Sequence, residues 1–132
     1  MSLNVVITGA NRGIGLSFCK HYSDLGYTVY GICRTSSPQL DTLAGTVIDG
    51  IDISDANSCN TLSEKLSNVK IDLLINNAGI LANEIFGHLD YETIEMQFRV
   101  NALGTLRITE KLRNKLSSNA KIAILTSRMG SI

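Results

Sequence analysis

The sequence has few cysteines, no surplus of charge of either sign and no long hydrophobic run. Its three cysteines, Cys19, Cys33 and Cys59, are odd in number and widely spaced, with no Cys-x-x-Cys pair and no histidine cluster near them. This spacing argues against a disulfide framework or a metal site and predicts reduced, partly buried thiols. Because twelve basic residues balance twelve acidic ones, we expect no attraction to nucleic acid or to an anionic membrane.

Targeting signals are also missing from the sequence. Met1 and Ser2 lead directly into a short apolar run, without the basic and long apolar regions of a secretion signal. No apolar stretch reaches the length of a membrane span, so we expect a cytoplasmic protein. The chain has 132 residues, of which 44% are hydrophobic and 18% charged. It is therefore expected to form one domain, residues 1–132, with a core of its own.

What the sequence does contain is a regular alternation of strand and helix patterns. Apolar runs predict five strands, at residues 3–7, 28–32, 46–51, 71–75 and 121–125. Helical spacing of apolar residues predicts helices at 14–25, 54–66 and 90–116. The apolar stripe of the first helix is expected to contain Ile14, Phe18, Tyr22 and Leu25. Ser37-Pro38 is expected to cap and start a single helical turn. We expect Ser54 and Asp90 to cap the last two of these helices. The predicted fold is α/β, a doubly wound parallel sheet of order 3-2-1-4-5 with helices on both faces.

A glycine-rich turn, Thr8-Gly9-Ala10-Asn11-Arg12-Gly13-Ile14-Gly15, follows the first predicted strand. A helix that starts here directs its free N–H groups and its positive dipole end at one point, which suits a phosphate. Gly9 suits a sharp exit from the strand, Gly13 the close approach of a pyrophosphate, and Gly15 close packing of helix on sheet. The alternative is a turn that binds nothing. A P-loop is disfavoured, because no Gly-Lys-Ser/Thr follows the glycines.

Five signatures together give the chain a resemblance to a known family. They are the glycine turn, Asp52 after the third strand, Asn76-Asn77-Ala78-Gly79 after the fourth, Asn101 in the long helix, and Ser127-x-x-Gly130 after the fifth. In this order and spacing the chain resembles the N-terminal half of the short-chain dehydrogenases/reductases. Its end, residues 127–132, is similar to the C-factor and carbonyl-reductase-like branch. The resemblance implies a Rossmann-type sheet that is truncated before the family's last two strands.

The resemblance also implies a nicotinamide dinucleotide cofactor. The implied cofactor-binding residues are Gly9, Asn11, Arg12, Gly13, Ile14, Gly15, Arg34, Asp52, Ile53, Asn77, Ala78 and Gly79. NAD-binding members carry an acidic residue after the second strand, where this chain has Cys33-Arg34. Charge therefore favours NADP(H) over NAD(H), with Arg34 and Arg12 on the 2′-phosphate.

Each implied contact has a simpler alternative. Arg12 and Arg34 can be solvated arginines at the ends of their elements. Asp52 and the backbone of Ile53 are implied to contact the adenine, but Asp52 can also be an aspartate that approaches a helix beside Ser54. The segment Asn77-Ala78-Gly79 is implied to pass beneath the adenosine ribose. Its asparagine, in turn, can tie neighbouring strands together through side-chain hydrogen bonds.

Asn101 and Ser127 are the catalytic candidates that the resemblance implies. Asn101 falls on an apolar helical stripe with Phe98 and Thr105, so we expect its amide to face the core and to need a partner. That partner is either a backbone group or, in the family, a water that links the asparagine to the catalytic lysine at a helix kink. Ser127 is implied to hydrogen-bond the substrate carbonyl; otherwise it is an ordinary turn serine.

The family's proton-donating tyrosine, with a lysine four residues later, is missing from these 132 residues. The four tyrosines are each followed at that distance by another residue, namely Gly26, Gly31, Arg34 and Glu95. The implied reaction is NADPH-dependent hydride transfer to a ketone or aldehyde, giving an alcohol, and we expect this chain alone to be inactive. The alternatives are a dinucleotide-binding regulatory module without turnover and an interaction or signalling fragment. Because the fifth strand becomes an apolar edge, we expect a homo-oligomer or association with a C-terminal half.

Overall fold

Five parallel strands form the centre of the protein in a computed structural model, which describes residues 2–43 and 45–127. In the order of the sheet they are β3 (Thr46–Ile48), β2 (Thr28–Ile32), β1 (Asn4–Thr8), β4 (Ile71–Asn76) and β5 (Leu116–Ile124). Every neighbouring pair is parallel. This order confirms the predicted doubly wound α/β fold.

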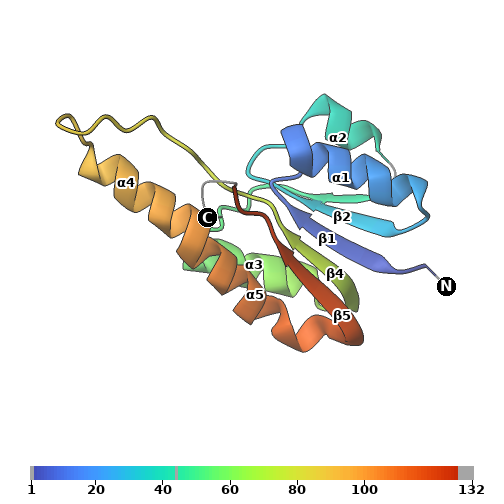
Figure 1. Cartoon of the computed structure of the whole chain (residues 1–132). Helices are drawn as coiled ribbons and strands as arrows, with labels where there is room; N and C mark the ends of the chain where they lie inside the picture. The colour runs from blue at the N-terminus through green and yellow to red at the C-terminus, as the bar shows by residue number, and fades with distance from the viewer. Residues whose placement is uncertain (1, 44, 128–132) are drawn as a thin grey trace.

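Helices cover both faces of the sheet (Figure 1). One face carries α1 (Gly13–Asp24) and α2 (Pro38–Thr42); the other carries α3 (Ala56–Lys65) and α5 (Thr105–Leu112). Successive residues of a strand point to opposite faces, so Val5 and Ile7 pack in the apolar layer under α1, while Val6 joins the layer under α3 and α5. Within the described residues, no helix combines the length and hydrophobicity needed to span a bilayer.

Two of the predicted caps are confirmed and one is wrong. The Ser37 Oγ accepts a hydrogen bond from the Leu40 N–H at 3.2 Å, and the Asp90 carboxylate accepts one from the Glu92 N–H at 3.1 Å. For α3 the cap is Asp55, which accepts from the Asn57 N–H at 3.1 Å, and not Ser54. Aspartate and serine are equally good caps; the helix begins one residue later because Ser54 bonds backward to Asp52 instead.

The long predicted helix is continuous but contains a wider turn. It consists of α4 (Tyr91–Phe98), the π-helical segment η1 (Arg99–Gly104) and α5. A π turn inserts an extra residue, so the helical periodicity on one side of it does not continue on the other. Gly104, Ile108 and Leu112 are buried, whereas Phe98 and Asn101 are exposed. The prediction that Asn101 faces the core is therefore wrong.

On α1 the predicted apolar stripe also differs from the observed one. Ile14 and Leu25 are 63% and 60% exposed, and the fully buried members of the helix are Gly15 and Cys19. The helix lies against the sheet through its small residues, because a larger side chain at position 15 would hold it away from β1 and its turn.

The last strand is longer than predicted. The helix ends at Leu112, a short 3₁₀ turn η2 (Arg113–Lys115) follows, and β5 begins at Leu116 instead of residue 121. Ile71 pairs with Leu116 but Leu73 pairs with Lys121, so β5 contains an irregularity opposite β4. The polar segment Ser117-Ser118-Asn119 has no strand pattern of its own, and it lies within this irregularity, between the paired residues Leu116 and Lys121. At the opposite edge β3 ends at Ile48, three residues before the predicted end.

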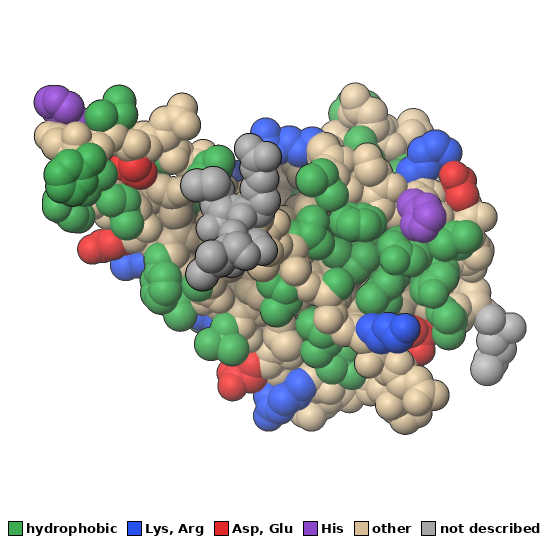
Figure 2. Space-filling model, viewed as in Figure 1, with side chains coloured by type: hydrophobic (Ala, Val, Ile, Leu, Met, Phe, Trp, Pro, Cys, Tyr) green, Lys and Arg blue, Asp and Glu red, His purple; other side chains and the backbone are tan. Residues whose placement is uncertain are grey.

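The outer edge of β5 leaves apolar side chains open to solvent. Ile122 is 44% exposed and Ile124 56%, and Figure 2 shows further hydrophobic side chains gathered on the visible face over α1 and the strands beside it. We expect the isolated chain to bind a hydrophobic dye strongly or to self-associate, because unpaired apolar edges promote association. The double substitution Ile122→Lys, Ile124→Lys should reduce both properties in dye titration and light scattering. A wild-type monomer with no dye binding and a sharp thermal transition would contradict this prediction.

Candidate functional site

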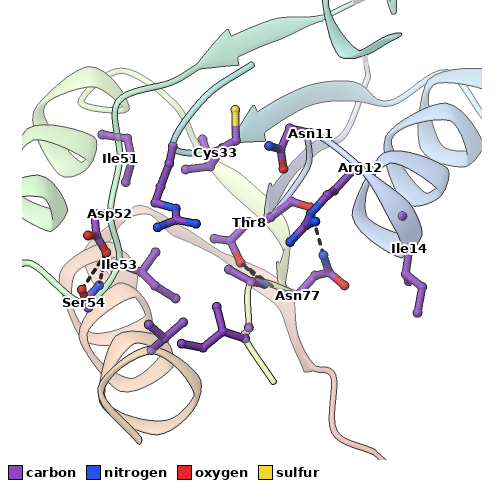
Figure 3. A pocket seen from close by; sticks show the side chains of 18 of the residues that line it. Thr8, Asn11, Arg12, Ile14, Cys33, Ile51, Asp52, Ile53, Ser54 and Asn77 are labelled. Atoms are coloured by element: carbon purple, nitrogen blue, oxygen red, sulfur yellow. Dashed lines mark hydrogen bonds between the residues drawn. The ribbon is translucent and has the colours of Figure 1, made fainter. Parts of the chain in front are cut away.

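A cavity of about 880 Å³ opens at the carboxyl ends of β1, β2 and β4, where the order of the strands reverses. Its volume is within the range of small-molecule sites, and this position is where open α/β sheets bind their ligands. The loops that follow β1, β2, β3 and β4 each supply part of the wall. Figure 3 shows Asp52 and Ser54 on one side of the cavity, with Arg12 and Asn77 on the other.

The glycine turn brings the first turn of α1 to the cavity. Gly9 and Gly13 have φ angles of +63° and +56°, which favour glycine. A Cβ on Gly13 would have no protein atom within 4 Å, so this position faces the open cavity that it lines. Gly15 does not line the cavity. A Cβ there would lie 2.0 Å from the Gly9 carbonyl oxygen, so this glycine allows close packing.

Thr8 connects the glycine turn to the loop after β4. Its side chain is buried, with 1% exposed, and its Oγ1 accepts hydrogen bonds from the Asn77 and Ala78 N–H groups, both at 3.0 Å. The Asn77 Nδ2 donates to the Gly9 carbonyl at 3.1 Å. The tie predicted as an alternative for Asn77 is therefore present, and it holds the Asn77-Ala78-Gly79 segment at the cavity wall.

Two arginines bring positive charge to the cavity, and the loop after β2, residues 33–37, contains no acidic side chain. Arg12, which precedes α1, and Arg34, which follows β2, both line the cavity. Asn11 also lines it, and its Nδ2 donates to the Thr35 carbonyl at 2.8 Å, which joins the glycine turn to the loop that carries Arg34. Both arginines predicted for the 2′-phosphate thus line the same cavity, each from a different loop.

Asp52 supplies a carboxylate to the cavity, across from Arg12 (Figure 3). Its Oδ1 accepts hydrogen bonds from the Ser54 hydroxyl at 2.7 Å and from the Ser54 N–H at 2.9 Å. The hydroxyl bond, followed by the backbone bond and the positive charge of Arg34, lowers the pKa of Asp52, and partial burial opposes this shift. Asp52 is therefore ionised near neutral pH and is available as a hydrogen-bond acceptor. Ile53 beside it also lines the cavity.

The two catalytic candidates lie outside the cavity lining. The Asn101 Oδ1 accepts from the Ile80 N–H at 2.8 Å, and its Nδ2 donates to the Ile80 carbonyl at 2.7 Å. Of the two predicted partners, the structure shows the backbone, at an exposed position in the π-helical segment. Ser127 is exposed just beyond β5. The predicted motif that continues from it to Gly130 lies outside the described residues.

Several residues of the lining were not predicted from the sequence. Thr8, Cys33, Ser54, Ile80, Met96 and Val100 are among the further residues that border the cavity. Met96 and Val100 are four residues apart on the long helix, which is a signal of a shared face that could have been used. Burial, and then the negative charges of Asp49 and Asp41, raise the pKa of Cys33, so this residue is a neutral thiol near pH 7.

The three cysteines are more deeply buried than the partly buried thiols predicted from the sequence. Cys19, Cys33 and Cys59 are all free and buried. In the part of the chain that the structure describes, no group of histidine, cysteine and acidic side chains could hold a metal ion.

A family model, related sequences and solved structures all match this chain over nearly its whole length. A family model described as "short chain dehydrogenase" matches residues 3–132. The 1-hydroxy-2-glutathionyl-2-methyl-3-butene dehydrogenase of Rhodococcus sp. (strain AD45) is 35% identical over 130 residues, which are 97% of this chain and 58% of that protein. A carbonyl reductase from Pseudomonas aeruginosa PAO1 superposes with a TM-score of 0.90 at 30% identity, covering 98% of this chain and 64% of that one.

A second solved structure, the NADPH-bound carbonyl reductase from chicken fatty liver, superposes with a TM-score of 0.84 at 25% identity. The match covers 100% of this chain and 62% of that one. The chain therefore spans less than two thirds of the length of each of these three proteins.

Proposed function

Because the chain belongs to the short-chain dehydrogenase family, whose matched relatives are oxidoreductases, we propose that residues 1–132 are the NADP(H)-binding portion of a carbonyl reductase. The observation that carries this proposal is the cavity that the glycine turn, Arg12, Arg34 and Asp52 line together. Two cations and a carboxylate around one cavity match the charges of a phosphorylated adenosine.

The residues around the cavity fit the parts of NADPH. The pyrophosphate lies at the N-terminus of α1 beside Gly13, where N–H groups and the helix dipole favour an anion. Arg12 and Arg34 hold the 2′-phosphate, which guanidinium groups bind through paired hydrogen bonds. Asp52 accepts from the adenine amino group, and the Asn77-Ala78-Gly79 segment lies beneath the ribose. The absence of a carboxylate at positions 33 and 34 removes the feature that would repel the 2′-phosphate.

When bound, NADPH supplies a hydride to a carbonyl carbon. The chain's own part in the proposed reaction is to hold and orient. Ser127 donates a hydrogen bond to the carbonyl oxygen of a small ketone or aldehyde substrate. Asn101 fixes the Ile80 backbone, which borders the cavity. The proton for the developing alkoxide has to come from a group outside these 132 residues, because they contain no Tyr-x-x-x-Lys.

The same absence favours a second candidate function, a dinucleotide-binding module without turnover. The two functions share the cavity and differ only in the proton donor. A longer chain or a complex distinguishes the two functions. A carbonyl reductase acquires the tyrosine and lysine from additional polypeptide, whereas a regulatory module binds NADPH without them.

Titration with NADPH and NADH side by side tests the binding proposal. We expect NADPH to bind at least about ten times more tightly than NADH, because a charge-assisted hydrogen bond contributes about 1.5–3 kcal/mol. Arg34→Ala should weaken the binding of NADPH by about 10- to 100-fold and leave the affinity for NADH nearly unchanged. The matched control is Arg113→Ala, since Arg113 is exposed and donates to the Glu110 carbonyl at its own helical end, away from the cavity lining. If NADPH and NADH bind with equal affinity, and Arg34→Ala changes neither affinity, the proposed binding of the 2′-phosphate by Arg12 and Arg34 is refuted.

A further inference from the structure

The loop that carries Asp52 is attached to a helix more than fifty residues away in the sequence. Nη1 of Arg107, in α5, donates a hydrogen bond to the Ser54 carbonyl at 2.8 Å, and the contact is partly buried. One turn earlier, the helix and the loop touch directly. A Cβ on Gly104 would lie 2.7 Å from Ile53 Cγ1 and 3.1 Å from the Ile53 carbonyl oxygen.

Ser54 is the link between this helix and the acidic side chain. Its N–H and its hydroxyl both donate to the Asp52 carboxylate, while its carbonyl accepts from Arg107. The Ser58 hydroxyl accepts from the Asp52 N–H at 3.1 Å, so α3 holds the other side of the loop. Moving the Ser54 main chain would therefore move the two donors that orient the carboxylate.

We propose that Arg107 is a positioning residue for adenine recognition: by fixing the Ser54 main chain, it keeps the Asp52 carboxylate aimed into the cavity. The inference rests on the proposed function, because it assigns Asp52 to the adenine. Arginine suits the task, since its planar guanidinium stays charged at all working pH values and donates in a fixed direction. Arg107 itself does not line the cavity, so it acts through Ser54 and not by touching the ligand.

A modified cofactor distinguishes positioning from a general contribution to stability. In the hypoxanthine analogue of NADPH, the adenine amino group is replaced by a carbonyl and N1 gains a proton. Both hydrogen bonds of the adenine are then lost, because the new carbonyl oxygen faces the Asp52 carboxylate, which can only accept, and the N1–H faces a backbone N–H, which can only donate. The wild-type chain should therefore bind NADPH at least about ten times more tightly than this analogue.

Arg107→Met should reduce the preference for NADPH over the hypoxanthine analogue to about two-fold or less, mainly by weakening the binding of NADPH. Arg107→Lys should restore a part of it, because an ammonium group can donate to the same carbonyl. Arg113→Met makes the same chemical change where the guanidinium donates to the Glu110 carbonyl at 2.9 Å, and it should keep the full preference. If the role of Arg107 is purely structural, Arg107→Met should weaken the binding of both cofactors equally and leave the ratio of their affinities unchanged.

A second variant covers the case in which Arg107→Met does not fold. Gly104→Ala keeps Arg107 but pushes against Ile53, and it should also lower the preference for NADPH. The inference is wrong if the wild-type chain binds NADPH and these variants keep its preference for NADPH over the hypoxanthine analogue. It is also wrong if the wild-type chain binds NADPH without such a preference. In both cases the proposed cofactor site stands. If the wild-type chain binds neither dinucleotide, the proposed function itself is refuted.

Discussion

Gly15→Ala is expected to destabilise the protein by about 3 kcal/mol or more and to abolish dinucleotide binding. The new Cβ would lie 2.0 Å from the Gly9 carbonyl oxygen, 2.8 Å from its carbon and 2.5 Å from the Asn77 Nδ2. The Gly9 atoms are backbone, and the Thr8 and Asn77 hydrogen bonds hold them in place. The helix must therefore move off the sheet. Thermal unfolding should show a decrease in Tm of roughly 10 °C, or no cooperative transition.

Gly13→Ala is the matched control for this prediction. It adds the same methyl group two residues earlier, where the Cβ meets no protein atom within 4 Å. Its positive φ angle of +56° costs about 1–2 kcal/mol for a non-glycine residue. We expect a folded protein with weakened NADPH binding, because the methyl group points into the cavity. A Gly15→Ala variant with the Tm of the wild type would show that the close packing of α1 on the turn is not required.

The second large effect is on turnover: the 132-residue chain should bind NADPH yet reduce no carbonyl compound above the uncatalysed rate. A positioned proton donor contributes about 10²- to 10⁴-fold to such a reaction, and these residues include no tyrosine with a lysine four positions later. The measurement is loss of NADPH absorbance with small ketones and aldehydes, at protein concentrations at which fluorescence titration shows the cofactor to be bound.

A control distinguishes the lack of a proton donor from a failure to bind the carbonyl substrate. Cofactor fluorescence with and without the carbonyl compound reports whether the ternary complex forms, independently of turnover. Carbonyl-dependent oxidation of NADPH that disappears in Ser127→Ala would contradict the prediction. That result would mean that the described residues supply a proton donor of another kind.

Much of the fold could be predicted because it depends on local patterns. Apolar runs separated by helical spacing identified all five strands, and βαβ handedness then gave their order. The glycine turn, Arg12, Arg34, Asp52 and the Asn77-Ala78-Gly79 segment all meet at one cavity, because the carboxyl ends of parallel strands lie at one edge of a sheet. Of the predicted cofactor residues, only Gly15 lies outside the lining.

The errors arose where a distant contact overruled a local pattern. A π-helical segment, which has no clear sequence signature, shifted the helical face and left Asn101 exposed. The pairing of Leu116 and Lys121 with β4 placed the polar segment between them inside β5. A serine and an aspartate compete equally well as caps, and the bonds from Ser54 back to Asp52 decided between them.

By itself, the sequence determined the α/β class, the order of the strands and the charge of the residues that border the cavity, because hydrophobic periodicity and turn chemistry act over a few neighbouring residues. The tertiary structure alone decided that Thr8 joins two strand ends, that Asn101 holds Ile80, and that Arg107 supports the Asp52 loop. These hydrogen bonds join residues 21 to 69 positions apart. Their partners meet only after the sheet has assembled, so no local pattern encodes them.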